Sequence, residues 1–538
     1  MSSRLSRFRF SWTFGLTPAG YSIRCCVAAL AVAVLALGGC ASGPKDFDRK
    51  PSSALEDPGG TTAGRFFLPE LEKHSGQSGF ILLPFAEEAF RARNGAAAIA
   101  DKTIDAQYYI WESDSTGKLL VNRLISAADR GVRVRLLLDD YLTTGRDLGI
   151  AMVDGHPNIE VRVFNPFLNR TFRGIDYLTD FSRVNHRMHN KAFISDNAVA
   201  VIGGRNIADA YFGVDSEANF RDLDVLAIGP VVKEVSRSFD IFWNSDLAVP
   251  IGAVIDFDVL AEERQKRFQT LREWSIQEAE GYPYVVFRER QERIASLDRL
   301  RDRFIWAEAE VLFDDPDKAM GTGKQGIAPR LLQVIANLKD ELLIESAYFV
   351  PGEKGVVLLG GLEKRGVDVR ILTNSLASND VPAVFAGYAP YRMPLLRHGV
   401  ELHELRADPG TVRRYWSNLA VSAKATLHTK TLVFDRSAVF IGSMNLDPRS
   451  GKINTEIGLL IHSEELSTQV AAFIELGMEP DNSYAVSLDD KHGGAYERLI
   501  WQGETHGETV RYHDDPDAGL GLQIRSWFLS LLPIEKQL

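Results

Sequence analysis

The sequence predicts an α/β fold of two tandem α/β sandwich domains with mixed sheets, related by a pseudo-twofold axis and sharing one site at their interface. The chain has 538 residues, of which 45% are hydrophobic and 25% charged. That composition is ordinary for a globular protein and the length allows several domains of about 150 residues. Strand-like runs alternate with helical ones, which is typical of α/β domains. The second half of the chain also repeats the first.

The first 39 residues have the pattern of a secretion signal. They contain four arginines, no acidic residue and an apolar run over residues 27–37. The run ends in Leu37-Gly38-Gly39-Cys40, which is similar to the lipobox of bacterial lipoproteins. We therefore expect a signal peptide over 1–39 and lipidation of Cys40. A transmembrane anchor is the alternative, although the run is shorter than the roughly 20 residues that span a bilayer.

The cysteine count agrees with acylation. Cys25, Cys26 and Cys40 are the three cysteines of the chain. A chain processed at Cys40 therefore has no second thiol for a disulfide or a thiolate zinc site. Residue 41 is Ala rather than Asp, so nothing beside the anchor resembles an inner-membrane retention signal. We expect a membrane-anchored lipoprotein of the bacterial cell envelope that faces the periplasm, in either the inner or the outer membrane.

Composition divides the rest of the chain into five segments. Residues 40–75 are rich in Pro, Ser, Gly and charge, which predicts a flexible tether. A first domain is expected over 76–256 and a second over 311–480. Between them, residues 257–310 are rich in Glu, Arg and Gln at helical spacing, which indicates a solvated helical connector. A C-terminal extension follows over 481–538.

The extension ends in an apolar cluster formed by Trp527, Phe528, Leu529, Leu531 and Leu532. Such a cluster can pack on a domain or enter the interface of a bilayer. Packing on a domain is the commoner outcome and is the one we expect, with bilayer contact as the alternative.

Strand-like segments recur in the same order in the two domains. A helical pattern over 85–100 precedes the first of them. The repeated pairs are 104–111 and 344–351, 131–140 and 366–375, and 159–165 and 400–406. Because the copies keep their order, a whole domain is duplicated. Any shared site is then expected between the two copies.

Each domain also contains the same polar motif. The first copy supplies His189, Lys191, Asp196 and Asn206, and the second supplies His428, Lys430, Asp435 and Asn445. The two histidines are 239 residues apart, and the same spacing separates the paired Lys, Asp, first Gly and Asn positions. A constant spacing over five positions of functional type is the strongest signal in the sequence.

The spacing within each motif suits phosphodiester chemistry. Residues i and i+2 of a strand face the same way, so each His is presented together with its Lys. The small residues before each Asn would let a substrate approach the backbone. Two imidazoles, two ammonium groups and two carboxamides can together hold the non-bridging oxygens, attack phosphorus and protonate the leaving oxygen.

A carboxylate beside a histidine fixes its tautomer and stabilises the imidazolium. Asp222 and Glu456 occupy equivalent places downstream of the two motifs. We expect these two residues to orient the histidines, with Asp224 as the alternative to Asp222. No histidine stands at ligand spacing from an acidic pair, so no metal site is predicted.

The doubled pattern H-x-K-x4-D followed by G-G/S-x-N resembles the phospholipase D superfamily. Longer stretches, among them GGRNIADAYFG, DLDVLAIGPVV and GSMNLDPRS, resemble the bacterial cardiolipin synthases of the C type. The likeness extends from about residue 76 to the C-terminus. It implies phospholipase D-like domains that act through a phosphohistidine without metal or other cofactor.

The resemblance also implies a role for each motif residue. His189 is expected as the nucleophile and His428 as the general acid and then base, with the reverse assignment left open. The implied ligands of the phosphate oxygens are Lys191, Lys430, Asn206 and Asn445. Asp196 and Asp435 complete the two catalytic motifs and are expected to serve the local fold.

The implied reaction transfers a phosphatidyl group to phosphatidylglycerol and so makes cardiolipin. The donor is left open, with phosphatidylethanolamine as one candidate. We expect phospholipids and a membrane as partners and see no sign of an obligate protein partner. A hydrolytic phospholipase D that releases phosphatidic acid is the alternative. The formal net charge of −11 argues against a nuclease that holds nucleic acid by its backbone, and two complete motifs argue against an inactive scaffold.

Overall fold

The computed structural model describes residues 47, 50–255, 259–287, 290–324, 326–410, 423–489, 497–532 and 535–537. The expected signal peptide over 1–39 and the expected lipidation site Cys40 lie outside these residues. None of the helices in the described part of the chain combines the length and the apolar character that crossing a bilayer requires.

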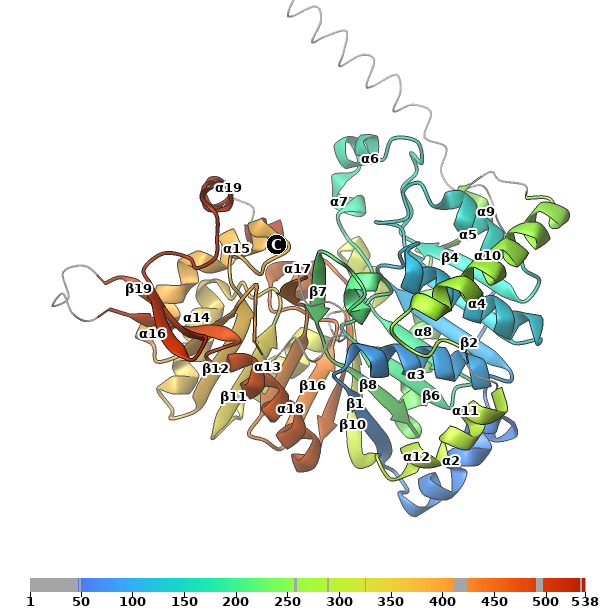
Figure 1. Cartoon of the computed structure of the whole chain (residues 1–538), viewed down its shortest axis with the longest axis horizontal. Coiled ribbons are helices and arrows are strands. Elements are labelled where there is room, and N and C mark those ends of the chain that lie inside the picture. The colour runs from blue at the N-terminus through green and yellow to red at the C-terminus, as the bar shows by residue number, and fades with distance from the viewer. Residues whose placement is uncertain are drawn as a thin grey trace, which may run out of the picture.

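Eighteen strands form one continuous mixed sheet that passes through both lobes of the molecule (Figure 1). The strands of lobe 1 are β1 (Ser78–Leu83), β2 (Thr103–Tyr108), β3 (Arg133–Asp139), β4 (Ile159–Phe164), β5 (Ala192–Ser195), β6 (Val199–Gly203), β8 (Asp224–Ile228) and β9 (Ala248–Pro250). Those of lobe 2 are β10 (Ile305–Phe313), β11 (Glu341–Ser346), β12 (Asp368–Asn374), β13 (Glu401–Leu405), β15 (Lys430–Phe434), β16 (Ala438–Gly442), β17 (Ile457–His462), β18 (Ser483–Leu488), β19 (Leu499–Thr505) and β20 (Glu508–Tyr512).

The strand order confirms the predicted duplication. Lobe 1 has the order β1-β8-β6-β5-β2-β3-β4, and lobe 2 repeats it as β10-β17-β16-β15-β11-β12-β13. The three strands that end each series are parallel and the others are antiparallel. β1 and β10 pair antiparallel at the centre, which relates the two lobes by a pseudo-twofold axis.

Helices cover both faces of this sheet. Those of lobe 1 are α3 (Ala86–Ile99), α4 (Ser115–Asp129), α5 (Asp147–Asp154), α6 (Gly174–Thr179), α7 (Phe181–Val184), α8 (Pro230–Trp243) and α9 (Ile251–Val254), with the 3-10 helix η2 (Asp209–Phe212). Those of lobe 2 are α13 (Ile327–Ala336), α14 (Gly352–Glu363), α15 (Pro382–Tyr388), α16 (Arg392–Arg397), α17 (Pro448–Lys452), α18 (Glu464–Met478) and α19 (Leu520–Ser530), with the 3-10 helices η3 (Pro316–Met320), η4 (Ala389–Tyr391) and η6 (Glu535–Gln537). Helices on both sides explain why the parallel strands are almost continuously buried.

The buried apolar side chains form three layers. One layer belongs to lobe 1 and includes α3 and α4, and another belongs to lobe 2 and includes α13 and α14. The layer between them takes residues from both sheets together with α8 and α18. The two lobes therefore share a core, and the interface between them is fixed by packing.

Two of the expected segment boundaries need correction. β10 begins at Ile305, inside the expected connector, and pairs with β1 and then with β17. The helices α10 (Ala261–Gly281), α11 (Arg290–Ser296) and α12 (Asp298–Arg301) make up the helical part of that connector. The sheet of lobe 2 also runs past residue 480, because β18 pairs with β13. Both strands begin within a few residues of the end of a helix, where the change from one pattern to the other is hard to place from sequence.

The expected tether over 40–75 is wrong for its second half. η1 (Pro58–Gly60) and α2 (Thr62–Lys73) lie there, and the Thr61 side chain caps α2 by accepting from Gly64 N. Phe67 is buried with its ring 5.5 Å from that of Phe304. A polar composition concealed a few apolar residues at helical spacing, and these are enough to hold one helix on lobe 1.

Candidate active site

The two polar motifs meet where the lobes face each other. His189 lies just before β5 and His428 just before β15. Main-chain bonds reach across the interface, because His189 N donates to Thr455 O at 2.9 Å and His428 N donates to Arg221 O at 2.8 Å. Strands β7 (Ala218–Arg221) and β14 (Lys424–Leu427), one from each lobe, pair parallel beside them. The expected shared site is therefore built from both lobes.

Each histidine is held by a carboxylate of the other lobe. His189 Nδ1 lies 2.8 Å from Glu456 Oε2, and His428 Nδ1 lies 2.6 Å from Asp222 Oδ2. Because a carboxylate accepts, Nδ1 carries the hydrogen in each ring and the lone pair is on Nε2. The two expected carboxylates thus touch the histidines, but in a crossed arrangement that sequence order does not indicate.

The small residues of the motifs make room for these carboxylates. A Cβ on Gly204 would lie 2.1 Å from Asp222 Oδ1, so a side chain there would displace the carboxylate. At the equivalent position of lobe 2, Ser443 instead donates from Oγ to Glu456 Oε2. Ser450 Oγ donates to the other oxygen, Oε1, at 2.7 Å. The expected role of the small residues, close approach of substrate, is therefore corrected: the carboxylate is what comes close.

Asp224, the alternative to Asp222, faces away from both histidines. Its Oδ2 lies 2.9 Å from Arg93 Nη1 and 3.5 Å from Arg205 Nη1, and all three side chains are buried. Asp224 therefore neutralises two buried guanidinium groups of lobe 1. Asp222 rather than Asp224 therefore lies against a histidine, as expected.

The two lysines lie beside the histidines and are fully buried. Lys191 Nζ donates to His189 O at 2.6 Å, and Lys430 Nζ donates to His428 O. Each ammonium also lies over an aromatic face: Lys191 Nζ is 5.4 Å from the centre of the Tyr109 ring, and Lys430 Nζ is 5.9 Å from that of Tyr348.

Burial governs the ionisation of this site. It lowers the pKa of His189 to about 4, against the opposing effect of Glu456, and lowers the pKa of His428 well below its usual value, with the facing lysines adding to the shift. Burial also lowers the pKa of Lys191 to about 7 and that of Lys430 to about 8. Near neutral pH both imidazoles are therefore uncharged and the lysines are close to losing their protons.

The two motif asparagines differ in how far they are engaged. Asn206 Oδ1 accepts from Ile110 N at 3.1 Å, and its Nδ2 donates to Tyr211 Oη at 2.9 Å. One N–H of Asn206 is therefore already used. Within the described residues, Oδ1 of Asn445 is buried and has no hydrogen-bond partner. This oxygen is an acceptor, so a contact from Asn445 to a phosphate oxygen would have to come from its Nδ2 donors.

The motif aspartates lie outside the site. Asp196 accepts from the backbone N–H groups of residues 101–103 at 2.7–2.8 Å. Asp435 accepts in the same way from residues 339–341. Each directly follows the strand that begins at or just after its motif lysine, β5 or β15, in a turn with positive φ. The aspartates grouped with the catalytic residues therefore fix the strand ends, which is the structural role also expected for them.

Sequence reasoning missed the aromatic walls of the site. The ring of Tyr109 lies 5.0 Å from that of His189, and the ring of Tyr211 lies 4.9 Å from that of His428, both edge to face. Phe220 contributes a third ring, 5.1 Å from that of His428. The repeat contained one usable signal, since Tyr109 and Tyr348 keep the 239-residue spacing of the motifs.

The sequence of this chain is similar to those of known proteins. The family model described as "Cardiolipin synthase, PLD-like domain" matches residues 97–243 and 331–476. The protein named "Cardiolipin synthase C" of Escherichia coli strain K12 is 40% identical over 474 residues, which cover 87% of this chain and 98% of the relative. An uncharacterized protein of Helicobacter pylori strain J99 is 32% identical over 486 residues, covering 89% of this chain and 93% of that protein.

A solved structure shares the fold. The crystal structure of the phosphatidylserine synthase of Haemophilus influenzae Rd KW20 aligns with a TM-score of 0.50 at 14% sequence identity. The alignment covers 78% of this chain and 92% of that one.

Proposed function

We propose a function from one premise: this chain belongs to the cardiolipin synthase family of proteins with phospholipase D-like domains. It is a phosphatidyltransferase of the phospholipase D type. We propose that it transfers a phosphatidyl group to phosphatidylglycerol and so forms cardiolipin. Hydrolysis to phosphatidic acid is not favoured by this relationship. The observation that carries the proposal is the pair of imidazoles, each bonded to a carboxylate of the opposite lobe and each beside a buried lysine.

In the first half of the reaction, Nε2 of His189 attacks the phosphorus of the donor lipid. A P–N bond forms while the bond from phosphorus to the head alcohol breaks, and its electron pair stays on the leaving oxygen. That oxygen takes a proton from Nε2 of His428, whose pKa rises when an anionic phosphate binds beside it. Lys191, Lys430 and Asn445 hold the non-bridging oxygens.

In the second half, a hydroxyl of phosphatidylglycerol gives its proton to Nε2 of His428 and attacks the same phosphorus. The P–N bond breaks and its electron pair returns to His189. Glu456 and Asp222 stabilise the imidazolium forms on each side of the cycle. Water competes for the same intermediate, so acceptor binding decides the product.

Mass spectrometry of the lipid products tests this function. The purified chain is incubated with phosphatidylglycerol alone, and then with phosphatidylethanolamine added. Cardiolipin with release of glycerol is expected in the first case, and release of ethanolamine would identify phosphatidylethanolamine as a donor. Phosphatidic acid as the sole product with phosphatidylglycerol present would contradict the proposal. A His428→Ala preparation controls for contaminating enzymes.

The lysine pKa values predict that activity falls at an unusually low alkaline pH. Charge on Lys191 and Lys430 is present below their pKa values of about 7 and 8 and is lost above them. We therefore expect kcat/KM for an anionic lipid to fall as the pH rises through 7 to 8, far below the ordinary lysine range. A series of kcat/KM values from pH 6 to 9.5 measures this, and a flat profile up to pH 9.5 would contradict it.

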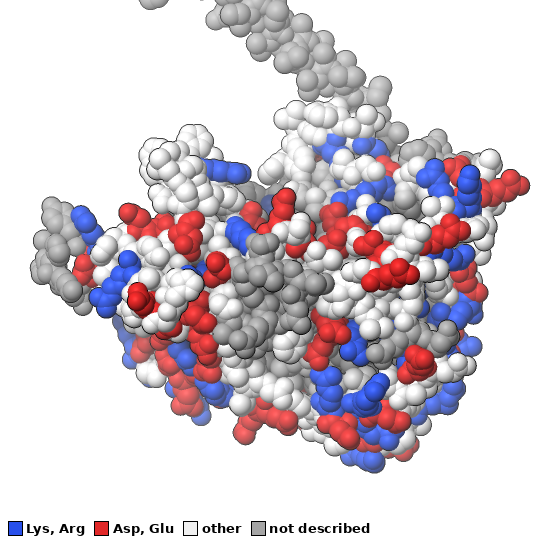
Figure 2. Space-filling view, in the orientation of Figure 1, with Lys and Arg blue, Asp and Glu red and all other residues white. Residues whose placement is uncertain are grey.

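We also propose that the chain works on a membrane of the cell envelope, anchored by lipidation of Cys40 after removal of residues 1–39. An apolar surface supports contact with lipid. Trp527 on α19 is 63% exposed, and Leu178 on α6 is 73% exposed. The two helices project from different lobes on the same side of the molecule (Figure 1), and Figure 2 shows that both projections are mostly uncharged. The expected packing of the C-terminal cluster on a domain is therefore corrected.

Trp527 offers a direct test of that contact. Vesicles of phosphatidylethanolamine and brominated phosphatidylglycerol should quench the part of the fluorescence that is absent from a Trp527→Phe variant. Trp527→Ser combined with Phe528→Ser should weaken vesicle binding by at least about tenfold, because burial of one such side chain contributes roughly 1.5–3 kcal/mol. Val357→Ser, at a residue of α14 that is even more exposed, is the control. Equal vesicle binding by the unmodified chain, the double serine variant and Val357→Ser would contradict the contact.

A further inference from the structure

Lobe 1 contains an apolar cavity of about 460 Å³ between its sheet and the helices α4, α5 and α10. This volume lies within the range usual for small-molecule sites. Most of the wall is aliphatic or aromatic, formed by Val121, Ile125, Leu136, Leu138, Leu142, Leu148, Ile150, Met152, Val153, Val161, Phe268 and Leu271. The cavity therefore suits a hydrocarbon ligand.

One end of the cavity adjoins the active site. Tyr109 and Asp139 belong to its wall. The Tyr109 ring is the one that meets His189 edge to face at 5.0 Å, and it also lies under Lys191. Asp139 Oδ2 accepts from Met188 N, the residue before His189, at 2.8 Å. The cavity and the proposed nucleophile thus share Tyr109 as a common neighbour.

The charged groups of the wall are already engaged, so they do not call for a charged ligand. Arg146 pairs with Glu112 and donates from Nη1 to Trp111 O at 3.0 Å. Arg267 pairs with Glu263 at 2.7 Å, and Lys118 Nζ lies 5.0 Å from the centre of the Trp274 ring. The remaining wall of the cavity is apolar. Covering that surface would remove it from water, which favours binding of a hydrocarbon chain.

We propose that this cavity receives an acyl chain of the phosphatidyl group while its phosphorus is bonded to His189. The inference rests on the proposed function, because it assigns a place to one part of that substrate. It gives lobe 1 the task of holding the donor, since the cavity and His189 lie on the same lobe. It also explains how a phosphatidyl group can stay in place while one alcohol leaves and another arrives.

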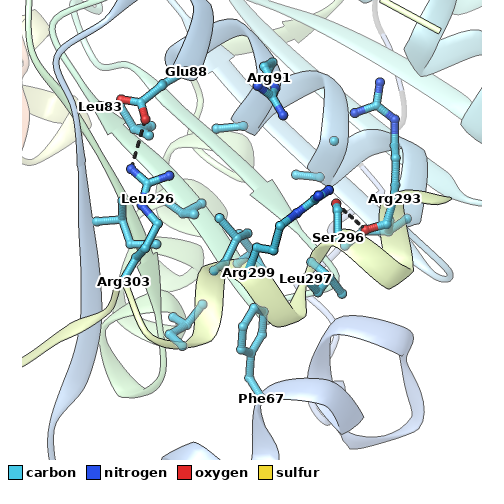
Figure 3. Close-up of a pocket in the computed structure, with 18 of the residues that line it drawn as sticks. Phe67, Leu83, Glu88, Arg91, Leu226, Arg293, Ser296, Leu297, Arg299 and Arg303 are labelled. Atoms are coloured by element: carbon cyan, nitrogen blue, oxygen red, sulfur yellow. Dashed lines mark hydrogen bonds and ion pairs between the residues drawn. The ribbon is translucent and has the colours of Figure 1, made fainter. Parts of the chain in front are cut away.

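A second cavity provides a control. It measures about 340 Å³ and lies between α2, α3, α11 and α12. Its lining includes Arg91, Arg293, Arg299 and Arg303 (Figure 3). Arg303 pairs with Glu88 at 2.9 Å. No residue of its lining is shared with the first cavity. Ala92 on α3 lines this second cavity in the same way that Val121 on α4 lines the first.

Filling variants separate the two cavities. The measurement is kcat/KM for total phosphatidyl turnover, transfer plus hydrolysis, on donors with six-carbon and sixteen-carbon chains. Val121→Phe and Val153→Phe should each reduce the sixteen-to-six ratio by about tenfold, a discrimination usual for hydrophobic pockets. Ala92→Phe should leave the ratio unchanged. Thermal unfolding of each variant shows whether the fold is kept.

Cross-linking of the unmodified chain gives an independent measurement. Phosphatidylglycerol with a diazirine near the end of one acyl chain should label peptides from α4 and α5, and Val121→Phe should suppress that labelling. Labelling of other segments, or an equal ratio in Val121→Phe and Ala92→Phe, would overturn the cavity assignment. Failure of the proposed function appears differently: the unmodified chain would then form no cardiolipin, whatever the chain-length ratio.

Discussion

His189→Ala is expected to abolish the covalent intermediate, whereas His428→Ala is expected to let it form from a donor whose leaving group needs no proton, and then persist. His189 supplies the nitrogen that bonds to phosphorus, so its loss should reduce kcat by about 10⁶-fold, as for other nucleophiles. His428 moves protons, so its loss should cost about 10²–10⁴-fold. Both rings are held by carboxylates across the interface, and both are uncharged near neutral pH.

A donor with a nitrophenolate leaving group distinguishes the two roles. Nitrophenolate leaves without a proton, so His428→Ala can still form the phosphohistidine with it but lacks the base that activates the acceptor. With a ³²P-labelled donor, His428→Ala should therefore retain acid-labile label on the protein and His189→Ala should retain none. Label on His189→Ala and none on His428→Ala would establish the reverse assignment. Label on neither, with full turnover in either variant, would contradict a phosphohistidine mechanism.

Asp222→Asn should lower the kcat of the folded protein by about 10⁴-fold. An amide in place of the carboxylate can donate to Nδ1 and so stabilise the wrong tautomer of His428, and it cannot balance the imidazolium. The structure offers a matched control two residues away. Asp224 is equally buried but faces Arg93 and Arg205. Asp224→Asn should cost roughly 3–5 kcal/mol of stability by leaving buried charge unpaired, with a much smaller effect on the kcat of the folded protein.

The crossed arrangement predicts which step each carboxylate serves. Asp222→Asn should behave as His428→Ala does and retain label from the nitrophenyl donor. Glu456→Gln should behave as His189→Ala does and form little intermediate. These two variants exchange their phenotypes if each carboxylate serves the histidine of its own lobe. Label retention and kcat, measured beside a melting temperature, decide between the two patterns.

The sequence alone was enough to predict the features that the duplication reveals. The constant spacing of the motifs predicts two lobes and one composite site, and the α/β class of each lobe follows from the alternation of strands and helices. The crossed carboxylates could not be predicted, because Asp222 and Glu456 each follow a histidine of their own lobe along the chain. Only the placement of one lobe against the other shows that each reaches the opposite ring.

Other differences have similar local causes. A composition typical of a linker hid α2, whose contact with lobe 1 depends on a few side chains such as Phe67. The sequence shows that Gly204 and Ser443 occupy equivalent positions. The reason for the difference is the size of the carboxylate side chain that each one faces. Aspartate fills the space that a Cβ would take, whereas glutamate lies within reach of a hydroxyl.

Strand β10 restricts how this enzyme admits its substrates. Three of its residues are in register with β1 of lobe 1, and six are in register with β17 of lobe 2. A hinge motion that separated the lobes would have to break the hydrogen bonds between β1 and β10 and expose the shared core. The two lobes should therefore stay together while the lipids enter and leave, and a gene that encoded either half alone would specify an unpaired sheet edge and half of a reaction centre.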